Sequence, residues 1–272
     1  MIGAIFIGFI LLMTGIFMVS WNLFGLYPSF EYTVINVTIV YMFAIPVLTM
    51  RSFAEEKHSR TDQLLYSLPM NMTSIVMAKF LAMVTILAVP VLVMCLYPLI
   101  LGSFGAVNYV SAYGAILAYF LLGCLVIAIG TFISSLFESQ VICAIVNLSL
   151  LLVLYFMTTV TSYISDSAVV SLVFLLILAA AVSGIVYFSV KNIIASAVTG
   201  GVLAAAALVV YFVNAELYTG LAQRMISTLF IFTPVSVFAF GTFDITCFIY
   251  YLSLTVLFVF FTIQSFEKRR WD

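Results

Sequence analysis

Long apolar runs, divided by short polar breaks, follow one another along this sequence. Eight of them approach or exceed the length of a membrane-spanning helix, which needs about 20 apolar residues. They cover residues 3–25, 33–50, 75–101, 111–135, 140–163, 168–190, 194–214 and 245–266. The pattern predicts an all-α fold, a polytopic transmembrane helix bundle of about eight spans that forms one transmembrane domain over residues 1–272.

The polar breaks differ in strength, and one of them leaves the number of spans open. The firmest breaks are 26–32, 51–74, 102–110 and 215–244. The weakest is 191–193, where only Lys191 and Asn192 interrupt the apolar residues. The two flanking runs could instead form one re-entrant hairpin, which would leave six full spans.

Lysine and arginine predict the orientation, because cytoplasmic loops carry an excess of both. With the 51–74 break inside, eight spans place only Arg224 on the outer side. The basic residues on the inner side are Arg51, Lys57, Arg60, Lys79, Lys191, Lys268, Arg269 and Arg270. Both termini are then cytoplasmic, and the six-span alternative leaves them there. Lys79 lies about one turn inside its span, where its stem can reach back to the interface.

Composition supports the membrane assignment. Of the 272 residues, 66% are hydrophobic and only 7% are charged, whereas a soluble domain carries about 25% charged residues. The sequence therefore predicts a multi-pass protein of the cell membrane, in contact with the lipid bilayer. The formal net charge is −1, so nothing points to a nucleic-acid partner.

The sequence offers no set of residues for catalysis. It contains no GxxxxGK[ST] phosphate loop, and its one histidine, His58, lies in a charged break. The four cysteines lie in apolar runs without a CxxC pair, which indicates packing residues. We therefore expect no enzyme activity, catalytic residue, metal or cofactor in this chain. The predicted spans also lack ionisable residues near their middle, which disfavours an ATP-independent carrier.

Charged residues concentrate between Arg51 and Asp62. The second span is expected to continue as a helix through this stretch until "HSRTD" interrupts it. A second short helix would then carry an apolar stripe and end at Pro69. This projection could lie on lipid headgroups as an interfacial helix, or it could dock a soluble protein. Its balanced charge favours a protein, because lipid-binding helices are usually strongly basic.

Three stretches of the sequence resemble a known family. The first is "PVLTMRSFAEEKHSRTDQLLYSLPMNMTSIVMAKFLA" (46–82), which resembles the permease subunits of ABC transporters in the ABC-2 membrane family. The gliding-motility and nitrous-oxide-cluster type of permease is the most similar branch. "FISSLFESQVICA" (132–144) resembles the family's S-S-L-T-E-N-Q turn, and residues 240–271 resemble its closing segment. The three stretches occur in the order found in the family.

The resemblance implies a role for the polar projection. In that family the segment after the second span is a coupling helix that docks in a groove of a separate ATPase. The implied coupling element is 51–74, and its partner-coupling residues are Arg51, Glu55, Glu56, Thr61, Asp62, Gln63 and Leu64. A second implied contact consists of Glu138, Ser139 and Gln140. Residues 215–244 would form an outer-side loop with short helices before the last span.

Two features depart from the family pattern. Members usually begin with a basic amphipathic elbow segment, whereas this sequence starts at "MIGAIFIGF", so a short or missing elbow is expected. Many members have six spans, and the runs within 168–214 resemble an additional pair.

The function implied by the resemblance is that of a membrane permease subunit of an ATP-driven exporter. Its partners would be an ABC-type ATPase subunit, which would hold ATP and Mg, and a second permease copy or paralogue. An outer-side accessory protein is compatible with this assembly. Apolar walls suit a lipidic, amphipathic or peptide substrate, but no substrate-binding residue can be named. The alternative is a non-transporting membrane scaffold that anchors an ATPase or an extracytoplasmic complex.

Overall fold

A computed structural model of the chain describes residues 2–25, 29–60, 71–190, 193–213, 215–228, 230–239 and 245–271. These residues form helices and no β-strand, which agrees with the predicted all-α class. The chain divides into two compact units. Unit 1 comprises Met1–Val153 and Ile231–Asp272, and unit 2 comprises Leu154–Phe230.

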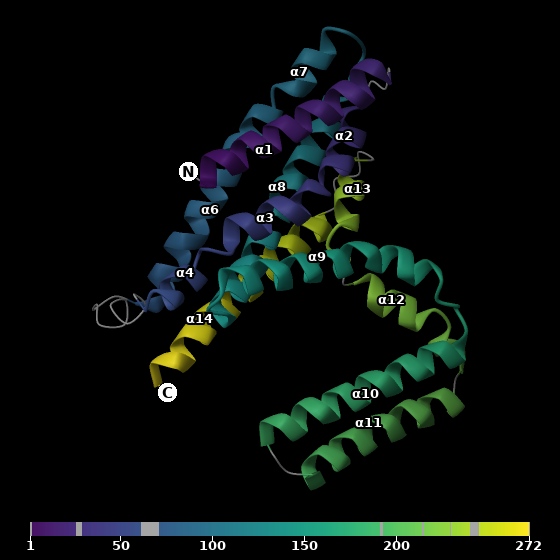
Figure 1. Ribbon diagram of the computed structural model, residues 1–272. Helices are drawn as coiled ribbons and strands as arrows, with labels where there is room; N and C mark the ends of the chain where they lie inside the picture. Colours follow the sequence, from purple (N-terminus) through teal and green to yellow (C-terminus); the bar gives the residue numbers. More distant parts are fainter. Residues whose placement is uncertain are drawn as a thin grey trace. The chain divides into compact units, whose positions relative to one another are not determined.

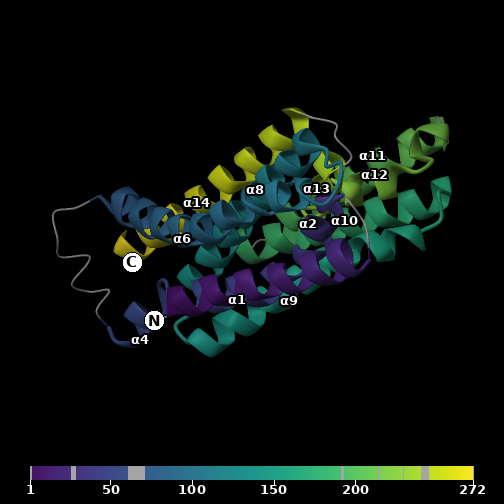
Figure 2. The ribbon, with the colours of Figure 1, turned by 90° about the horizontal axis from the view of Figure 1, so that it is seen from above.

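Unit 1 is a bundle of long helices with several short ones, shown in Figures 1 and 2. Its long helices α1, α6, α8 and α14 lie side by side, and α13 packs against α8. The described elements are α1 (Ile2–Phe17), the π-helix η1 (Met18–Phe24), α2 (Phe30–Val37), α3 (Val40–Thr49), α4 (Ala54–His58), α6 (Met72–Met94), α7 (Tyr97–Gly102), α8 (Tyr109–Leu136), the first part of α9 (Gln140–Ser162), α13 (Thr233–Ala239) and α14 (Ile245–Trp271).

Among the residues that the structure describes, five helical segments are long and apolar enough to cross a membrane. They are Ile2–Phe24, Met72–Gly102, Tyr109–Leu136, Gln140–Ser162 and Ile245–Lys268, and each coincides with a predicted run. Two bent helix pairs raise the number to as many as seven within the described residues. The run 33–50 falls in one of these pairs, in which α2 and the following segment meet at 49°. The count of eight stays a prediction.

Helix α8 forms the centre of unit 1. In its most apolar stretch 78% of the residues are buried, compared with 17% in α14. Small residues along α8 let neighbouring helices approach closely. At Gly123, for example, an added Cβ would lie 2.9 Å from the Tyr41 hydroxyl oxygen. Tyr41 stacks on Tyr119 at a centroid distance of 4.1 Å and donates a 3.2 Å hydrogen bond to its carbonyl.

Unit 2 is built on the hairpin of α10 (Ala168–Val190) and α11 (Ile193–Val213), which pack side by side in Figure 1. The short helices η2 (Ala215–Tyr218) and α12 (Leu221–Ser227) follow and pack on α10. Gly220 joins them with a left-handed φ of 68°, a conformation that glycine adopts without strain. Its amide donates a 3.0 Å hydrogen bond to the Asp166 carbonyl. Short helices thus occur within the predicted 215–244 segment.

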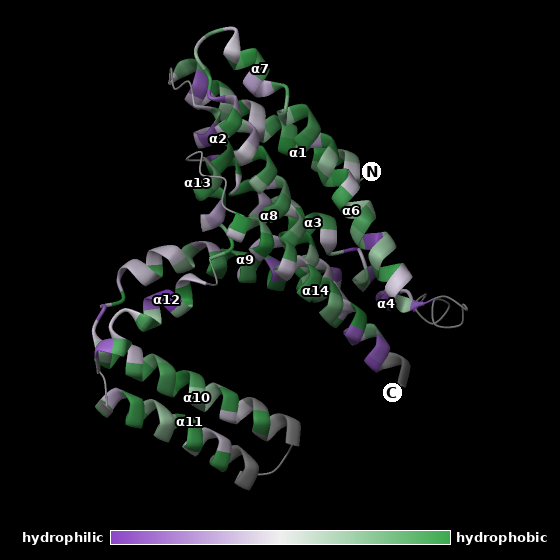
Figure 3. Cartoon of the chain, turned by 180° about the vertical axis from the view of Figure 1, so that it is seen from behind, coloured by the Kyte–Doolittle hydropathy of each residue, from purple (hydrophilic) through white to green (hydrophobic). Residues whose placement is uncertain are grey.

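Figure 3 shows that apolar residues cover the long helices of unit 1, while hydrophilic residues gather around α4 and at the end of α14. The two regions lie close together, because the Phe53 and Phe266 rings pack at a centroid distance of 4.7 Å. This end of unit 1 carries a network of hydrogen bonds and an ion pair that joins several helices, and it contains part of the predicted coupling element.

Candidate functional site

Helix α4 begins with a cap that another helix supplies. Its first residues find no side-chain cap within their own segment. Instead, the amides of Phe53 and Ala54 each donate a 3.1 Å hydrogen bond to the hydroxyl oxygen of Ser134, in the last turn of α8. Phe53 and Ala54 are buried, so their amides need such an acceptor. The bond ties the start of α4 to the end of α8.

This arrangement explains a difference from the sequence prediction. The second span was expected to continue as a helix through Lys57, but α3 ends at Thr49 and α4 starts at Ala54. The backbone leaves the helical region at Phe53, where φ is −127°. Since Ser134 accepts the amides of Phe53 and Ala54, these groups are satisfied without a continuous helical ladder. The helical ladder can therefore be interrupted between α3 and α4, which together still form the segment Val40–His58 of one candidate span.

Lys57 makes the reverse connection. Its ammonium group donates to the backbone carbonyl of Ser135, one of the last carbonyls of α8. The same group lies 5.2 Å from the centre of the Phe266 ring, within the range of a cation–π interaction. Only 5% of Lys57 is exposed. Helices α4 and α8 thus cap each other, and α14 supplies the aromatic surface beneath them.

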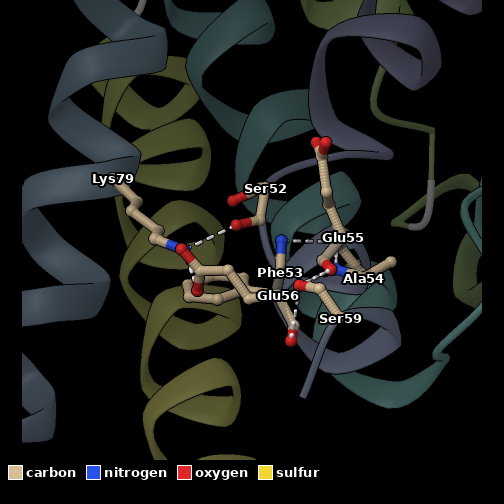
Figure 4. A network of polar contacts seen from close by, with 8 residues as sticks. Ser52, Phe53, Ala54, Glu55, Glu56, Ser59 and Lys79 are labelled. Atoms are coloured by element: carbon tan, nitrogen blue, oxygen red, sulfur yellow. Dashed lines mark hydrogen bonds and ion pairs between the residues drawn. The ribbon is translucent and has the colours of Figure 1, made fainter. Parts of the chain in front are cut away.

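A third helix holds the same segment through Lys79 of α6. The Lys79 ammonium forms an ion pair with Glu56 and donates a 2.7 Å hydrogen bond to the Ser52 carbonyl. It also lies 4.3 Å from the centre of the Phe53 ring. Figure 4 shows Lys79 reaching from α6 to both oxygen partners. The predicted position of Lys79, with its stem reaching back from a span, agrees with this contact.

The far end of α4 is closed by local bonds. The Ser59 hydroxyl donates to the Glu55 carbonyl at 2.8 Å, within one turn of helix. Arg60 follows with φ of 55°, the left-handed conformation in which many helices end. Helix α4 is therefore a single short turn, fixed at its start by α8 and ended by its own sequence.

Helix α4 and its flanks have two distinct faces. Phe53, Ala54 and Lys57 are buried against the bundle, and Glu56 is half-buried against Lys79. The opposite face carries charged side chains, and in Figure 4 the Glu55 carboxylate points away from Lys79 and Glu56. The exposed face consists of Arg51, Glu55, His58 and Arg60.

The predicted partner-coupling residues thus fall into separate groups. Arg51 and Glu55 are exposed, whereas Glu56 is engaged within the chain. Glu138 is exposed in the turn after α8, and Ser139 and Gln140 are half-buried. This turn follows Ser135 by three residues, so Lys57 brings the two predicted segments to the same end of unit 1. Thr61, Asp62, Gln63 and Leu64 lie outside the described residues.

Sequence reasoning missed the residues that anchor the element. Lys57 was assigned only to the cytoplasmic side, and Ser134 and Phe266 were not singled out. One signal was present, because Phe53, Ala54 and Lys57 are spaced as one face of a helical turn. A lysine on an apolar face indicates a partner for its ammonium group. The described residues hold no cluster of three or more His, Cys, Asp or Glu side chains that could bind a metal ion.

These features define an all-helical, multi-pass membrane protein whose bundle carries a polar element fixed to three long helices at one end. Residues 2–167, more than half of the chain, match the model of a family described as ABC-2 family transporter protein. The chain belongs to the ABC-2 transporter family, as the sequence predicted, and the matched residues include the stretches 46–82 and 132–144. It is a multi-pass protein of the cell membrane and a permease of ABC transporters. Searches of the curated proteins and of the solved structures give no match.

Proposed function

We propose that this permease couples to a separate ABC-type ATPase through the exposed face of α4 and exports its substrate. The observation that carries the proposal is the two-faced geometry of α4. Its inner face is bound to α6, α8 and α14, while its outer face presents charged side chains. A force applied to the outer face would reach three membrane helices directly.

The proposed orientation puts α4 and both termini in the cytoplasm. Lys57, Lys79 and the end of α14 gather at one end of unit 1, which supports the distribution of basic residues expected for a cytoplasmic side. ATP and Mg would bind to the partner ATPase. Hydrolysis there would shift α4 and, through its three anchors, alternate the spans between inward- and outward-facing or closed states.

Unit 1 would form the translocation pathway together with a second permease copy or paralogue. Export and a lipidic, amphipathic or peptide cargo rest on the family resemblance and on the apolar character of the spans. The short helices within 215–244 would lie on the outer side, where an accessory protein could bind them. Glu138, with its neighbours Ser139 and Gln140, would contribute a second cytoplasmic contact near α4.

Substitution of charged residues on the two faces of α4 tests the docking proposal, beginning with the exposed face. The tagged chain is purified from its native membrane in mild detergent, and bound ATPase is measured by mass spectrometry. Glu55→Lys should reduce the bound ATPase by about tenfold, as loss of a charge pair at a docking surface does. The control Glu216→Lys reverses an exposed carboxylate of unit 2 and should leave binding unchanged.

The inner face should behave differently. Glu56→Gln breaks the ion pair with Lys79 without changing the exposed face. We expect the ATPase to remain bound to this variant. The rate of ATP hydrolysis by the bound ATPase should, however, no longer differ from the rate of the ATPase without the permease. Undiminished ATPase binding in Glu55→Lys and Arg51→Glu would contradict the docking assignment. An ATPase that binds but never responds to candidate substrates would favour the scaffold alternative.

A further inference from the structure

Helix α9 is attached to unit 1 by a narrow contact. In its most apolar stretch 17% of the residues are buried, the same share as in α14 and far below the 78% in α8. Among the described residues α14 packs extensively on α8, whereas α9 packs extensively on no other helix. Within unit 1 its fully buried residues are Cys143, Asn147 and Leu151, one per turn along a single stripe. Val141 and Ile145, next to the stripe, are exposed. A helix held by so few contacts can shift without unpacking the bundle.

The start of α9 follows the α4 anchor closely in the sequence. Helix α8 ends at Leu136, two residues after Ser134, and α9 begins at Gln140. The Ser134 hydroxyl accepts the Phe53 and Ala54 amides. A displacement of α4 that disturbs Ser134 therefore acts on the short connection that leads into the first turn of α9.

One turn further along, Asn147 bonds to the helix that leads into α4. Its side-chain amide donates a 3.2 Å hydrogen bond to the Thr49 hydroxyl, at the end of α3. That hydroxyl donates its own proton to the Ile45 carbonyl at 2.9 Å. Because the Thr49 proton is already used, the hydroxyl can only accept from Asn147, which fixes the orientation of the Asn147 amide.

Gly130 of α8 makes this contact possible. A Cβ at position 130 would lie 2.7 Å from the Asn147 amide nitrogen and 2.8 Å from Cβ of Thr49. The three residues thus meet where α8 has no side chain. The amide oxygen of Asn147 is buried without a hydrogen-bond partner, so the contact satisfies only part of the amide. A buried acceptor left unpaired lowers the stability of this arrangement relative to any state that pairs it.

We infer that Asn147 is a positioning residue that holds α9 against α3 and α8 in the resting state, and that motion of α4 is passed to α9 through Ser134 and Thr49. The inference rests on the proposed coupling function and names the path of the motion. From Leu154 onward α9 belongs to unit 2, so α9 is one of the two covalent connections between the units and a route by which movement at α4 would leave unit 1.

The native Cys143 thiol provides the reporter for this inference. It is fully buried within the contact stripe of α9, so a maleimide should label it only when α9 moves away. Replacing Cys95, Cys124 and Cys247 by alanine leaves Cys143 as the single thiol. Labelling is followed by mass spectrometry on the purified permease–ATPase complex, without nucleotide and after trapping with ATP and vanadate.

We expect trapping to accelerate Cys143 labelling in the complex that retains Asn147. In Asn147→Leu the thiol should be labelled about fivefold faster without nucleotide, the factor expected for losing one buried hydrogen bond, and trapping should add little. Thr49→Val removes the hydroxyl that accepts the Asn147 hydrogen bond while it keeps the side-chain volume nearly constant. It should show the same faster labelling without nucleotide and the same weak response to trapping. The control Asn36→Leu loses only a bond to the Tyr32 carbonyl of its own helix and should keep the nucleotide response.

The inference fails if trapping leaves Cys143 protected in a complex that hydrolyses ATP. It also fails if both Asn147→Leu and Thr49→Val retain the unaltered nucleotide response. A chain that binds no ATPase would instead refute the proposed function. The purified permease alone distinguishes the two failures, because faster Cys143 labelling in Asn147→Leu than in Asn36→Leu does not need the ATPase.

Discussion

Lys57 donates a hydrogen bond to the carbonyl of Ser135, while the neighbouring Ser134 hydroxyl accepts the first amides of the helix that carries Lys57. Each helix terminus leaves backbone groups without intrahelical partners, and here the start of α4 and the end of α8 satisfy each other. The exchange keeps a one-turn helix, too short to be stable alone, in a defined place beneath the bundle.

Replacing Lys57 should therefore loosen α4. Lys57→Met retains most of the apolar stem but loses the bond to Ser135 and the charge above Phe266. We expect a loss of about 1.5–3 kcal/mol in unfolding free energy, the range for hydrogen bonds to charged groups, measured by denaturant titration in mixed micelles. Lys268→Met, an exposed lysine near the end of α14, is the control and should change stability little.

Ser134→Ala should release the start of α4. The substitution leaves the Phe53 and Ala54 amides buried without this acceptor, which costs about 1–3 kcal/mol for each unsatisfied group. Hydrogen exchange at these two amides should accelerate before the bundle unfolds. Ser135→Ala is a matched neighbour, because its hydroxyl bonds only to Phe132 of its own helix. Equal exchange in both variants would contradict the capping role.

The ion pair between Glu56 and Lys79 should contribute modestly and depend on salt. The Lys79 side chain is 22% exposed and the Glu56 side chain 31%, so solvent screens the pair in part. A double-mutant cycle with Glu56→Gln and Lys79→Met should give a coupling of about 0.5–1 kcal/mol, which falls as salt is raised. A coupling independent of salt would indicate that the pair acts through packing on Phe53 instead.

The sequence predicted the structure well where a single class of residue, apolar or charged, is sufficient to determine a local feature. Runs such as 111–135 predicted membrane helices, because apolar length alone is sufficient. The charged stretch that begins at Arg51 correctly indicated a special polar element. It did not reveal which face of α4 is buried, because that depends on Ser134 and Phe266, which are 80 and more positions away. The helix expected to run on from the second span is interrupted between Thr49 and Ala54 for the same reason, since a distant hydroxyl replaces the local ladder.

The number of spans illustrates a second limit. Apolar length predicts that a segment enters the membrane, but the bend between α2 and α3 lies inside a single run at Thr38 and Ile39. No proline or glycine marks this position. The course of such a run depends on the packing of α2 and α3 against α8, which a one-dimensional pattern does not contain.

Gly123→Ala should destabilise the centre of unit 1. The added methyl group would lie 2.5 Å from a Leu87 methyl carbon and 2.9 Å from the Tyr41 hydroxyl oxygen, so Leu87 and the stacked tyrosines would have to move. Overpacking of this kind costs about 1–3 kcal/mol, again measured by denaturant titration. Gly8→Ala is the control, because nothing lies within 4 Å of a Cβ there and alanine favours helix. Destabilisation of both variants by the same amount would attribute the effect to helix propensity rather than to the α3–α8 contact.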